Sequence, residues 1–285
     1  MIIIGANSFI GKYLYEYFSQ KEKVIGTYFS KPEENLIQFD ITNPEISSLG
    51  DLTNERYCII CSAIGRIDDC KKEEEKSRKI NVEGTKKLIE QLFSKNIIPI
   101  FFSSSYVFSG DNKNPDEKDE RNPRTVYGKQ KKEIEDFLIN SKKKFLILRL
   151  SKVYGLKKGD NSLLTGMIEQ ISRNDKNKYA ENQIMTPVYV EDIVRVLDLA
   201  IEKNLTGIYN VSGEEQFSWY DLAKIISDEF KLKNKIEACS INDFNFLEKP
   251  RPLNTGLNPD KIITEIGINF LTIEEAINKL KEIYK

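Results

Sequence analysis

The chain of 285 residues contains no histidine, and its four cysteines follow no regular spacing. The lack of histidine excludes catalysis by an imidazole base and leaves the usual zinc and iron sites short of ligands, so we expect no metal. Scattered cysteines do not predict a disulfide framework. Cys58 and Cys61 form a C-x-x-C in a strand-like run, where residues three apart point to opposite faces. We therefore expect buried, reduced thiols at these two positions.

The sequence also lacks a strong net charge and a long apolar run. Its 43 basic and 44 acidic residues leave a net charge of −1, so no long-range field attracts nucleic acid or an anionic membrane. No run approaches the length of a transmembrane helix, and the apolar start at residues 1–4 is too short for a signal peptide. We expect a cytoplasmic protein that binds neither nucleic acid nor membrane.

Short apolar runs alternate with segments of helical period through the first half of the chain. The strand-like runs lie at residues 1–4, 23–29, 38–41, 57–63, 97–102 and 145–150. Such alternation is typical of an α/β protein with a doubly wound parallel sheet, which binds ligands at the carboxyl ends of its strands. We predict a Rossmann-type nucleotide-binding domain over residues 1–150, with a return around 187–211. A smaller C-terminal α/β lobe, mainly for substrate binding, is expected over 151–285.

A glycine turn follows the first strand and leads into a helix. The turn reads GANSFIG at residues 5–11, and this arrangement aims backbone N–H groups and a helix dipole at a pyrophosphate. Ser8 stands where a middle glycine is usual, but a small serine still permits a close approach. We expect the turn to bind a dinucleotide through Gly5, Asn7, Ser8, Phe9, Ile10 and Gly11.

The second strand should end near the adenosine ribose, where an NAD site needs an acidic residue. The chain has Ser30 and Lys31 there, a hydroxyl and a cation suited to a 2′-phosphate, so the sequence favours NADP(H) over NAD(H). The alternative, that Lys31 is an ordinary loop lysine, stays open. Further cofactor contacts are expected from the ends of the third and fourth strands, at Asp40, Ile41, Ser62, Ala63 and Ile64.

A serine cluster follows the fifth strand, and a Tyr-x-x-x-Lys pair follows one loop later. Tyr127 and Lys131 are four residues apart on a predicted helix, so they should lie one above the other. A phenol with its ordinary pKa of about 10 is a poor acid at neutral pH, and a nearby ammonium lowers that pKa. Ser104, at the strand end, can hold a carbonyl oxygen beside the phenol. Together the three residues predict protonation of a ketone as hydride arrives, although Tyr-x-x-x-Lys alone occurs by chance in many helices.

Eight stretches of the sequence carry a family resemblance. They are GANSFIG at 5–11, FDIT at 39–42, NVEGT at 81–85, SSSYVFSG at 103–110, YGKQK at 127–131, RLSKVYG at 149–155, GIYNVSGEEQFSWYDLA at 207–223 and RPLNTGLNPDKI at 251–262. Together they resemble the extended short-chain dehydrogenase/reductase superfamily over essentially the whole chain. The closest likeness is to the dTDP-4-dehydrorhamnose reductase family of sugar-nucleotide 4-ketoreductases.

The resemblance implies a role for each residue of the Ser-Tyr-Lys set. Tyr127 would donate the proton, Lys131 would lower its pKa and bind the nicotinamide ribose, and Ser104 would orient the sugar carbonyl. Hydride would pass from NADPH to C4 of a 4-keto-6-deoxy sugar linked to a nucleotide, dTDP or UDP. The implied substrate-binding residues are Ser104, Ser105, Tyr106, Lys152, Trp219 and Arg251. A homodimer is compatible with the sequence, which leaves the oligomeric state open.

Three positions near the family's active site depart from its pattern. Ser105 and Ser109 replace two aspartates, and Lys152 replaces a tryptophan, so the sugar, the nucleotide and the stereochemistry at C4 stay open. Lys152 either meets a charged group of the substrate or is solvated. Trp219 either stacks on a base or sugar or packs into the core.

The same residues disfavour two other activities of related proteins. A 4,6-dehydratase needs an acidic pair after the residue at position 104, where the chain has Ser105 and Tyr106, and fucose-synthase epimerisation needs a histidine. A 4-epimerase that retains NAD remains an alternative. So does a non-catalytic NADP-binding regulatory subunit, like the β subunit of methionine adenosyltransferase.

Overall fold

A computed structural model describes residues 1–284. Contacts divide the chain into two compact units. The first comprises Met1–Val107, Thr125–Arg149 and Ala200–Tyr209, and the second comprises the rest of the described residues. None of the helices described within residues 1–284 is long and apolar enough to cross a bilayer.

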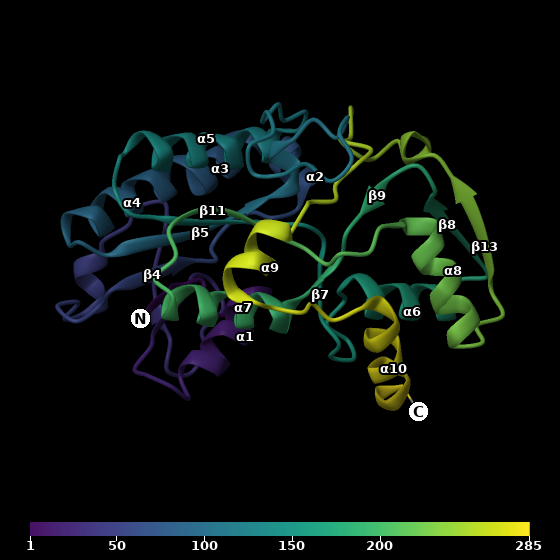
Figure 1. Ribbon diagram of the computed structural model, residues 1–285, viewed down its shortest axis with the longest axis horizontal. Helices are drawn as coiled ribbons and strands as arrows, with labels where there is room; N and C mark the ends of the chain where they lie inside the picture. Colours follow the sequence, from purple (N-terminus) through teal and green to yellow (C-terminus); the bar gives the residue numbers. More distant parts are fainter. Residues whose placement is uncertain (285) are drawn as a thin grey trace. The chain divides into compact units, whose positions relative to one another are not determined.

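The first unit is built on a seven-stranded parallel sheet, of which only the last residues of β6 and β11 fall outside the unit (Figure 1). The strand order is β11-β6-β5-β4-β1-β2-β3, so the order along the chain reverses between β1 and β4. The strands are β1 (Ile2–Ile4), β2 (Ile25–Tyr28), β3 (Ile37–Gln38), β4 (Tyr57–Ile60), β5 (Ile98–Ser104), β6 (Leu146–Leu150) and β11 (Gly207–Val211). Near-continuous apolar runs, as in β1 and β4, suit strands that are buried on both faces. The predicted Rossmann-type fold is confirmed.

Helices of the first unit lie on both faces of this sheet. In Figure 1, α3 and α5 lie above the strands and α1 lies below them. The helices are α1 (Phe9–Phe18), α2 (Ile67–Lys72), α3 (Glu74–Arg78), the π-helical segment η2 (Lys79–Gly84), α4 (Thr85–Ser94) and α5 (Val126–Asn140). The apolar face of α5 packs into the core through Ile134 and Leu138, both fully buried, with Phe137 partly buried beside them.

Several predicted strands are shorter in the structure, and β2, for example, spans Ile25–Tyr28 instead of residues 23–29. The third strand consists of Ile37–Gln38 alone, and β4 ends at Ile60 instead of reaching Ala63. Beyond the end of β4 the backbone turns into a loop. Cys58 is therefore buried as predicted, whereas Cys61 is only half-buried, and both thiols are free.

The second unit packs three helices and short strands around its own core. The helices α6 (Leu163–Arg173), α8 (Trp219–Glu229) and α10 (Ile273–Ile283) contribute their apolar faces to one buried cluster. A capping box formed by Ser218 and Asp221 is present at the start of α8. The remaining elements include β8 (Lys176–Ala180) paired with β13 (Lys235–Cys239), β7 (Val153–Tyr154) with β10 (Val188–Tyr189), β9 (Ile184–Met185) with β12 (Phe217–Ser218), α7 (Val190–Glu202) and α9 (Asp260–Ile266).

Candidate active site

A pocket of about 130 Å³ opens in the first unit beside the loops that follow β1 and β4. The strand order reverses between these two strands, and this is where doubly wound sheets bind their ligands. The lining residues are Ile4, Gly5, Asn7, Ser8, Thr27, Tyr28, Phe29, Phe39, Cys61, Ser62 and Ala63. Five of them, Gly5, Asn7, Ser8, Ser62 and Ala63, are among the predicted cofactor contacts.

The glycine turn at residues 5–11 is tight, and Ser8 in this turn caps the helix that follows. A Cβ atom at Gly11 would lie 2.2 Å from the carbonyl oxygen of Gly5, so no larger residue fits there. The Ser8 hydroxyl accepts a hydrogen bond from the Gly11 N–H at 3.2 Å and caps α1. Ser8 thus fixes the helix N-terminus beside the pocket, where a helix favours negative charge.

Thr27, which the sequence did not single out, holds this turn from the neighbouring strand. Its buried hydroxyl accepts from the Gly5 N–H at 2.9 Å, and its carbonyl accepts from the Ala6 N–H at 2.7 Å. A threonine in an otherwise apolar strand was the available signal. On the other side of the turn, the Asn7 side chain donates to the carbonyl of Lys31 at 3.1 Å.

The remaining residues predicted to bind the cofactor lie around this pocket without lining it. Ser30 and Lys31 follow Phe29, the first residue after β2, and are exposed. Asp40 is exposed, and its carboxylate accepts hydrogen bonds from the N–H and the hydroxyl of Thr42, each at 2.8 Å. Ile41 is buried, Ile10 and Ile64 are half-buried, and Phe9 is exposed.

The structure brings Ser104, Tyr127 and Lys131 together. Ser104 is the last residue of β5, and its hydroxyl is hydrogen-bonded to that of Tyr127 on α5. The Lys131 ammonium lies 5.7 Å from the centre of the Tyr127 ring and donates to the carbonyl of Phe102 at 2.7 Å. Thr125 caps α5 by accepting from the Gly128 N–H at 3.1 Å, which fixes the first turn that carries Tyr127.

Two neighbours from the predicted substrate set complete this cluster. Ser105 is buried at the start of the 3-10 turn η3 (Ser105–Val107). The ring of Tyr106 lies edge-on to that of Tyr127, with the centroids 6.2 Å apart and the planes at 71°. The Tyr106 N–H also donates to the Ser104 hydroxyl at 3.3 Å.

Burial dominates the electrostatics of the cluster and corrects one expectation. Burial raises the pKa of Tyr127 above its ordinary value, and the hydrogen bond with Ser104 opposes this only in part. The lowering of this pKa by Lys131, expected from the sequence, is wrong for this structure. Burial also lowers the pKa of Lys131 to about 8. Tyr127 therefore keeps its proton at neutral pH, and in this structure its phenol is a weaker acid than a phenol in water.

In the second unit, Lys152, Trp219 and Arg251 form a separate group. The Lys152 ammonium lies 5.2 Å from the centre of the Trp219 ring, and the Trp219 indole donates to the Gln183 side-chain oxygen at 3.0 Å. Lys152 as a whole is exposed and Arg251 is buried. Local desolvation of the ammonium, and then the charge of Arg251, lower the pKa of Lys152. Trp219 is half-buried and also packs against the core of this unit.

Comparison with known proteins gives matches over the full length. The family model of the RmlD substrate binding domain matches residues 1–285. The dTDP-4-dehydrorhamnose reductase of Aggregatibacter actinomycetemcomitans is 30% identical, over 99% of this chain and 98% of that protein. Methionine adenosyltransferase 2 subunit beta of Rattus norvegicus is 26% identical, over 94% and 82%.

A solved structure of a dTDP-4-dehydrorhamnose reductase resembles the chain over nearly its full length. The crystal structure of dTDP-4-dehydrorhamnose reductase from Bacillus anthracis in complex with NADP superposes with a TM-score of 0.85 at 26% identity, covering 99% of this chain and 98% of that one. The chain therefore belongs to the RmlD substrate binding domain family, within the extended short-chain dehydrogenase/reductases that its motifs resemble.

Proposed function

We propose that this chain uses NADPH to reduce the 4-keto group of a nucleotide-linked 4-keto-6-deoxy sugar, carried by dTDP or UDP. The observation that carries the proposal is the hydrogen bond between Ser104 and Tyr127, with the Lys131 ammonium 5.7 Å from the phenol ring. A reductase of the same family at 30% identity and the NADP complex of a second one support it.

The chain's own residues supply acid catalysis and orientation. NADPH, when bound, supplies the hydride. Gly5, Ser8 and Ser62, which line the pocket beside the N-terminus of α1, would hold its pyrophosphate and the middle of the molecule. Ser104 would donate to the sugar carbonyl oxygen, and Tyr127 would give that oxygen its proton. Such general acid catalysis contributes on the order of 10² to 10⁴ in rate.

A panel of dTDP-, UDP- and GDP-linked 4-keto-6-deoxy sugars, followed by loss of NADPH absorbance and by NMR of the product, tests the reaction. Tyr127→Phe should cut turnover at least a hundredfold, because it removes the proton donor. Its affinity for NADPH should stay within about threefold of wild type, because the ring and the helix remain. A Tyr127→Phe variant with unchanged turnover refutes the acid assignment. Wild-type protein that binds NADPH but reduces no sugar in the panel refutes the reaction and favours a binding role.

The preference for NADPH rests on Ser30 and Lys31, exposed after β2. A lysine near the adenosine ribose favours a 2′-phosphate over a 2′-hydroxyl. Wild type should bind NADPH more tightly than NADH, and Lys31→Ala should remove the difference. Lys23→Ala is the matched control, because this exposed lysine precedes the other end of β2. Equal loss of preference in both variants would show that overall charge, and not a contact of Lys31, sets the preference.

A further inference from the structure

A buried polar network links α5 to the loop after β4, and the reaction proposed above makes no use of it. Asn81, in the π-helical segment η2, fixes Ile64 of that loop through both backbone groups. The Ile64 N–H donates to the Asn81 side-chain oxygen at 2.8 Å, and the Asn81 amide donates to the Ile64 carbonyl at 3.1 Å. Ile64 directly follows Ser62 and Ala63, which line the pocket. The orientation of the pocket wall therefore depends on the Asn81 side chain.

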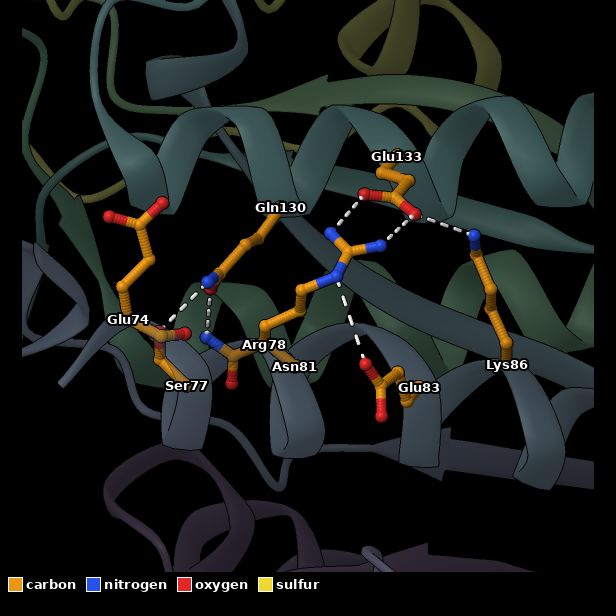
Figure 2. Close-up of polar contacts among 8 residues, drawn as sticks. All are labelled: Glu74, Ser77, Arg78, Asn81, Glu83, Lys86, Gln130 and Glu133. Atoms are coloured by element: carbon orange, nitrogen blue, oxygen red, sulfur yellow. Dashed lines mark hydrogen bonds and ion pairs between the residues drawn. The ribbon is translucent and has the colours of Figure 1, made fainter.

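Gln130 in turn holds Asn81 and Ser77 (Figure 2). The Asn81 amide donates to the Gln130 side-chain oxygen at 2.8 Å, and the Gln130 amide donates to the Ser77 hydroxyl at 2.8 Å. The Ser77 hydroxyl in turn donates a shared hydrogen bond to the carbonyls of Cys70 and Glu74, each at 3.0 Å. Asn81, Gln130 and Ser77 are all buried, so these bonds form away from competing water and matter more than surface bonds.

The position of Gln130 on its helix connects the network to the Ser-Tyr-Lys cluster. Gln130 lies on α5 between Tyr127 and Lys131. Helix α5, which carries Tyr127, is thus joined to the Ser62–Ile64 loop beside the pocket through the side-chain amides of Gln130 and Asn81. Segment η2 also packs closely against the backbone at Ile41. A Cβ atom at Gly84 would lie 2.0 Å from the Ile41 carbonyl oxygen, so only glycine permits this contact. Single π-helical turns inside longer helices are frequent at functional sites.

We propose that Gln130 is a positioning residue, which sets the distance between Tyr127 and the cofactor by holding Asn81 against the Ser62–Ile64 loop. This rests on the proposed function, because it requires NADPH in the pocket. Without Gln130 the Asn81 amide keeps its bonds to Ile64 but loses the constraint from α5. The loop can then shift relative to the phenol, and a small misplacement of reacting groups is costly to the rate.

The chain offers a matched control on the same helix, α5. Glu133, one turn beyond Gln130, binds Arg78 at 2.8 and 3.1 Å and Lys86 at 2.7 Å (Figure 2). This surface cluster also joins α5 to α3 and α4, but none of its hydrogen bonds reaches Ile64. A change at Glu133 therefore tests helix attachment without changing the link to the pocket loop.

The experiment compares Gln130→Met, which keeps length and helix propensity, with Glu133→Gln and wild type. We expect Gln130→Met to weaken NADPH binding about five- to tenfold and to lower kcat about tenfold. Hydrogen exchange should become faster in the peptide that covers residues 61–66. Glu133→Gln should stay within about twofold of wild type in all three measurements. Circular dichroism at the assay temperature confirms that each variant is folded. A purely structural role would lower only the unfolding temperature.

Each outcome decides the proposal. Unchanged NADPH affinity and unchanged exchange at 61–66 in Gln130→Met overturn it, and so does an equal effect of Glu133→Gln. If Gln130→Met does not fold, Ser77→Ala removes the acceptor of the Gln130 amide, together with the Ser77 bonds to the Cys70 and Glu74 carbonyls, and should weaken NADPH binding about two- to threefold. No change there overturns the proposal as well. Wild type that binds NADPH but reduces no sugar refutes the proposed reaction alone, since affinity and exchange still test Gln130. Wild type that binds no NADPH refutes both.

Discussion

Lys131 should make the folded protein less stable at neutral pH, although the proposed reaction needs it. Its side chain is buried, with the ammonium bonded to the Phe102 carbonyl and 4.5 Å from the Phe101 ring centre. Burial lowers the pKa of Lys131 from its ordinary 10.5 to about 8. Each pH unit of that separation corresponds to about 1.4 kcal/mol, so holding the charge in the folded state costs about 3 kcal/mol at pH 7.

The sign of the pH dependence follows from where each state releases its proton. Below pH 8 both states hold the proton, and the folded state bears the full cost. Between pH 8 and about 10.5 the folded state has released it while the unfolded chain still binds it, so wild-type stability rises with pH. Lys131→Met lacks this contribution altogether. Its free energy of unfolding, relative to wild type, should fall by about 2 to 3 kcal/mol from pH 7 to pH 10.

Lys131→Met should be the more stable protein at pH 7, by about 1 to 2 kcal/mol, since the lost hydrogen bond to Phe102 offsets part of the gain. Urea unfolding followed by circular dichroism at pH 7 and pH 10 measures the difference. Lys132→Met is the control: this partly exposed neighbour pairs with Asp136 at 2.9 Å, a surface pair worth only about 0.3 to 0.5 kcal/mol. A stability difference between Lys131→Met and wild type that stays constant between the two pH values would refute the reasoning.

Two further predictions concern the buried ion pair between Glu135 and Arg149 and the ammonium of Lys152 in the second unit. Glu135→Gln should lower the free energy of unfolding by about 3 to 5 kcal/mol, because it removes the carboxylate from the buried Arg149 guanidinium, bonded at 3.0 and 2.8 Å. Urea unfolding tests this, and a loss below 1 kcal/mol contradicts it. Lys152→Met should raise the KM for the sugar nucleotide about tenfold while the Kd for NADPH stays unchanged. Steady-state kinetics and a binding titration check this, and an unchanged KM would indicate a merely solvated lysine.

Local patterns were enough to predict the elements that carry the cluster. The apolar run before Ser104 became β5, and the helical period after Tyr127 became α5. Both depend on side chains close together in the sequence, where periodicity reports burial directly. The glycine turn at residues 5–11 is a similar case, since a tight turn between a strand and a helix restricts residue size at each position.

Features that depend on distant partners escaped the same reading. Strands β8 and β13 are short and contain charged residues, and their pairing joins segments that no sequence periodicity connects. Asn81 and Gln130 are 49 residues apart in the sequence. In the sequence each is an ordinary polar residue on a helix. Their burial and the hydrogen bond between them depend on how the fold brings the two helical segments together. A glycine inside a helix, Gly84, is the local sign of close packing in this segment, since a Cβ atom there would lie 2.0 Å from the Ile41 carbonyl oxygen.

The pKa of Tyr127 shows why proximity in sequence does not settle electrostatics. Four-residue spacing does place Lys131 near the phenol, and an ammonium at that distance would favour the phenolate in water-like surroundings. The fold, however, buries both groups, directs the ammonium toward the Phe102 carbonyl, and lowers the pKa of the lysine itself to about 8. Desolvation therefore outweighs the attraction and raises the pKa of Tyr127. The proposed ketone reduction would need a proton on the Tyr127 phenol at the moment of transfer. The raised pKa keeps that proton on Tyr127 at neutral pH but makes the phenol a weaker acid than a phenol in water, and the hydrogen bond with Ser104 opposes this rise only in part.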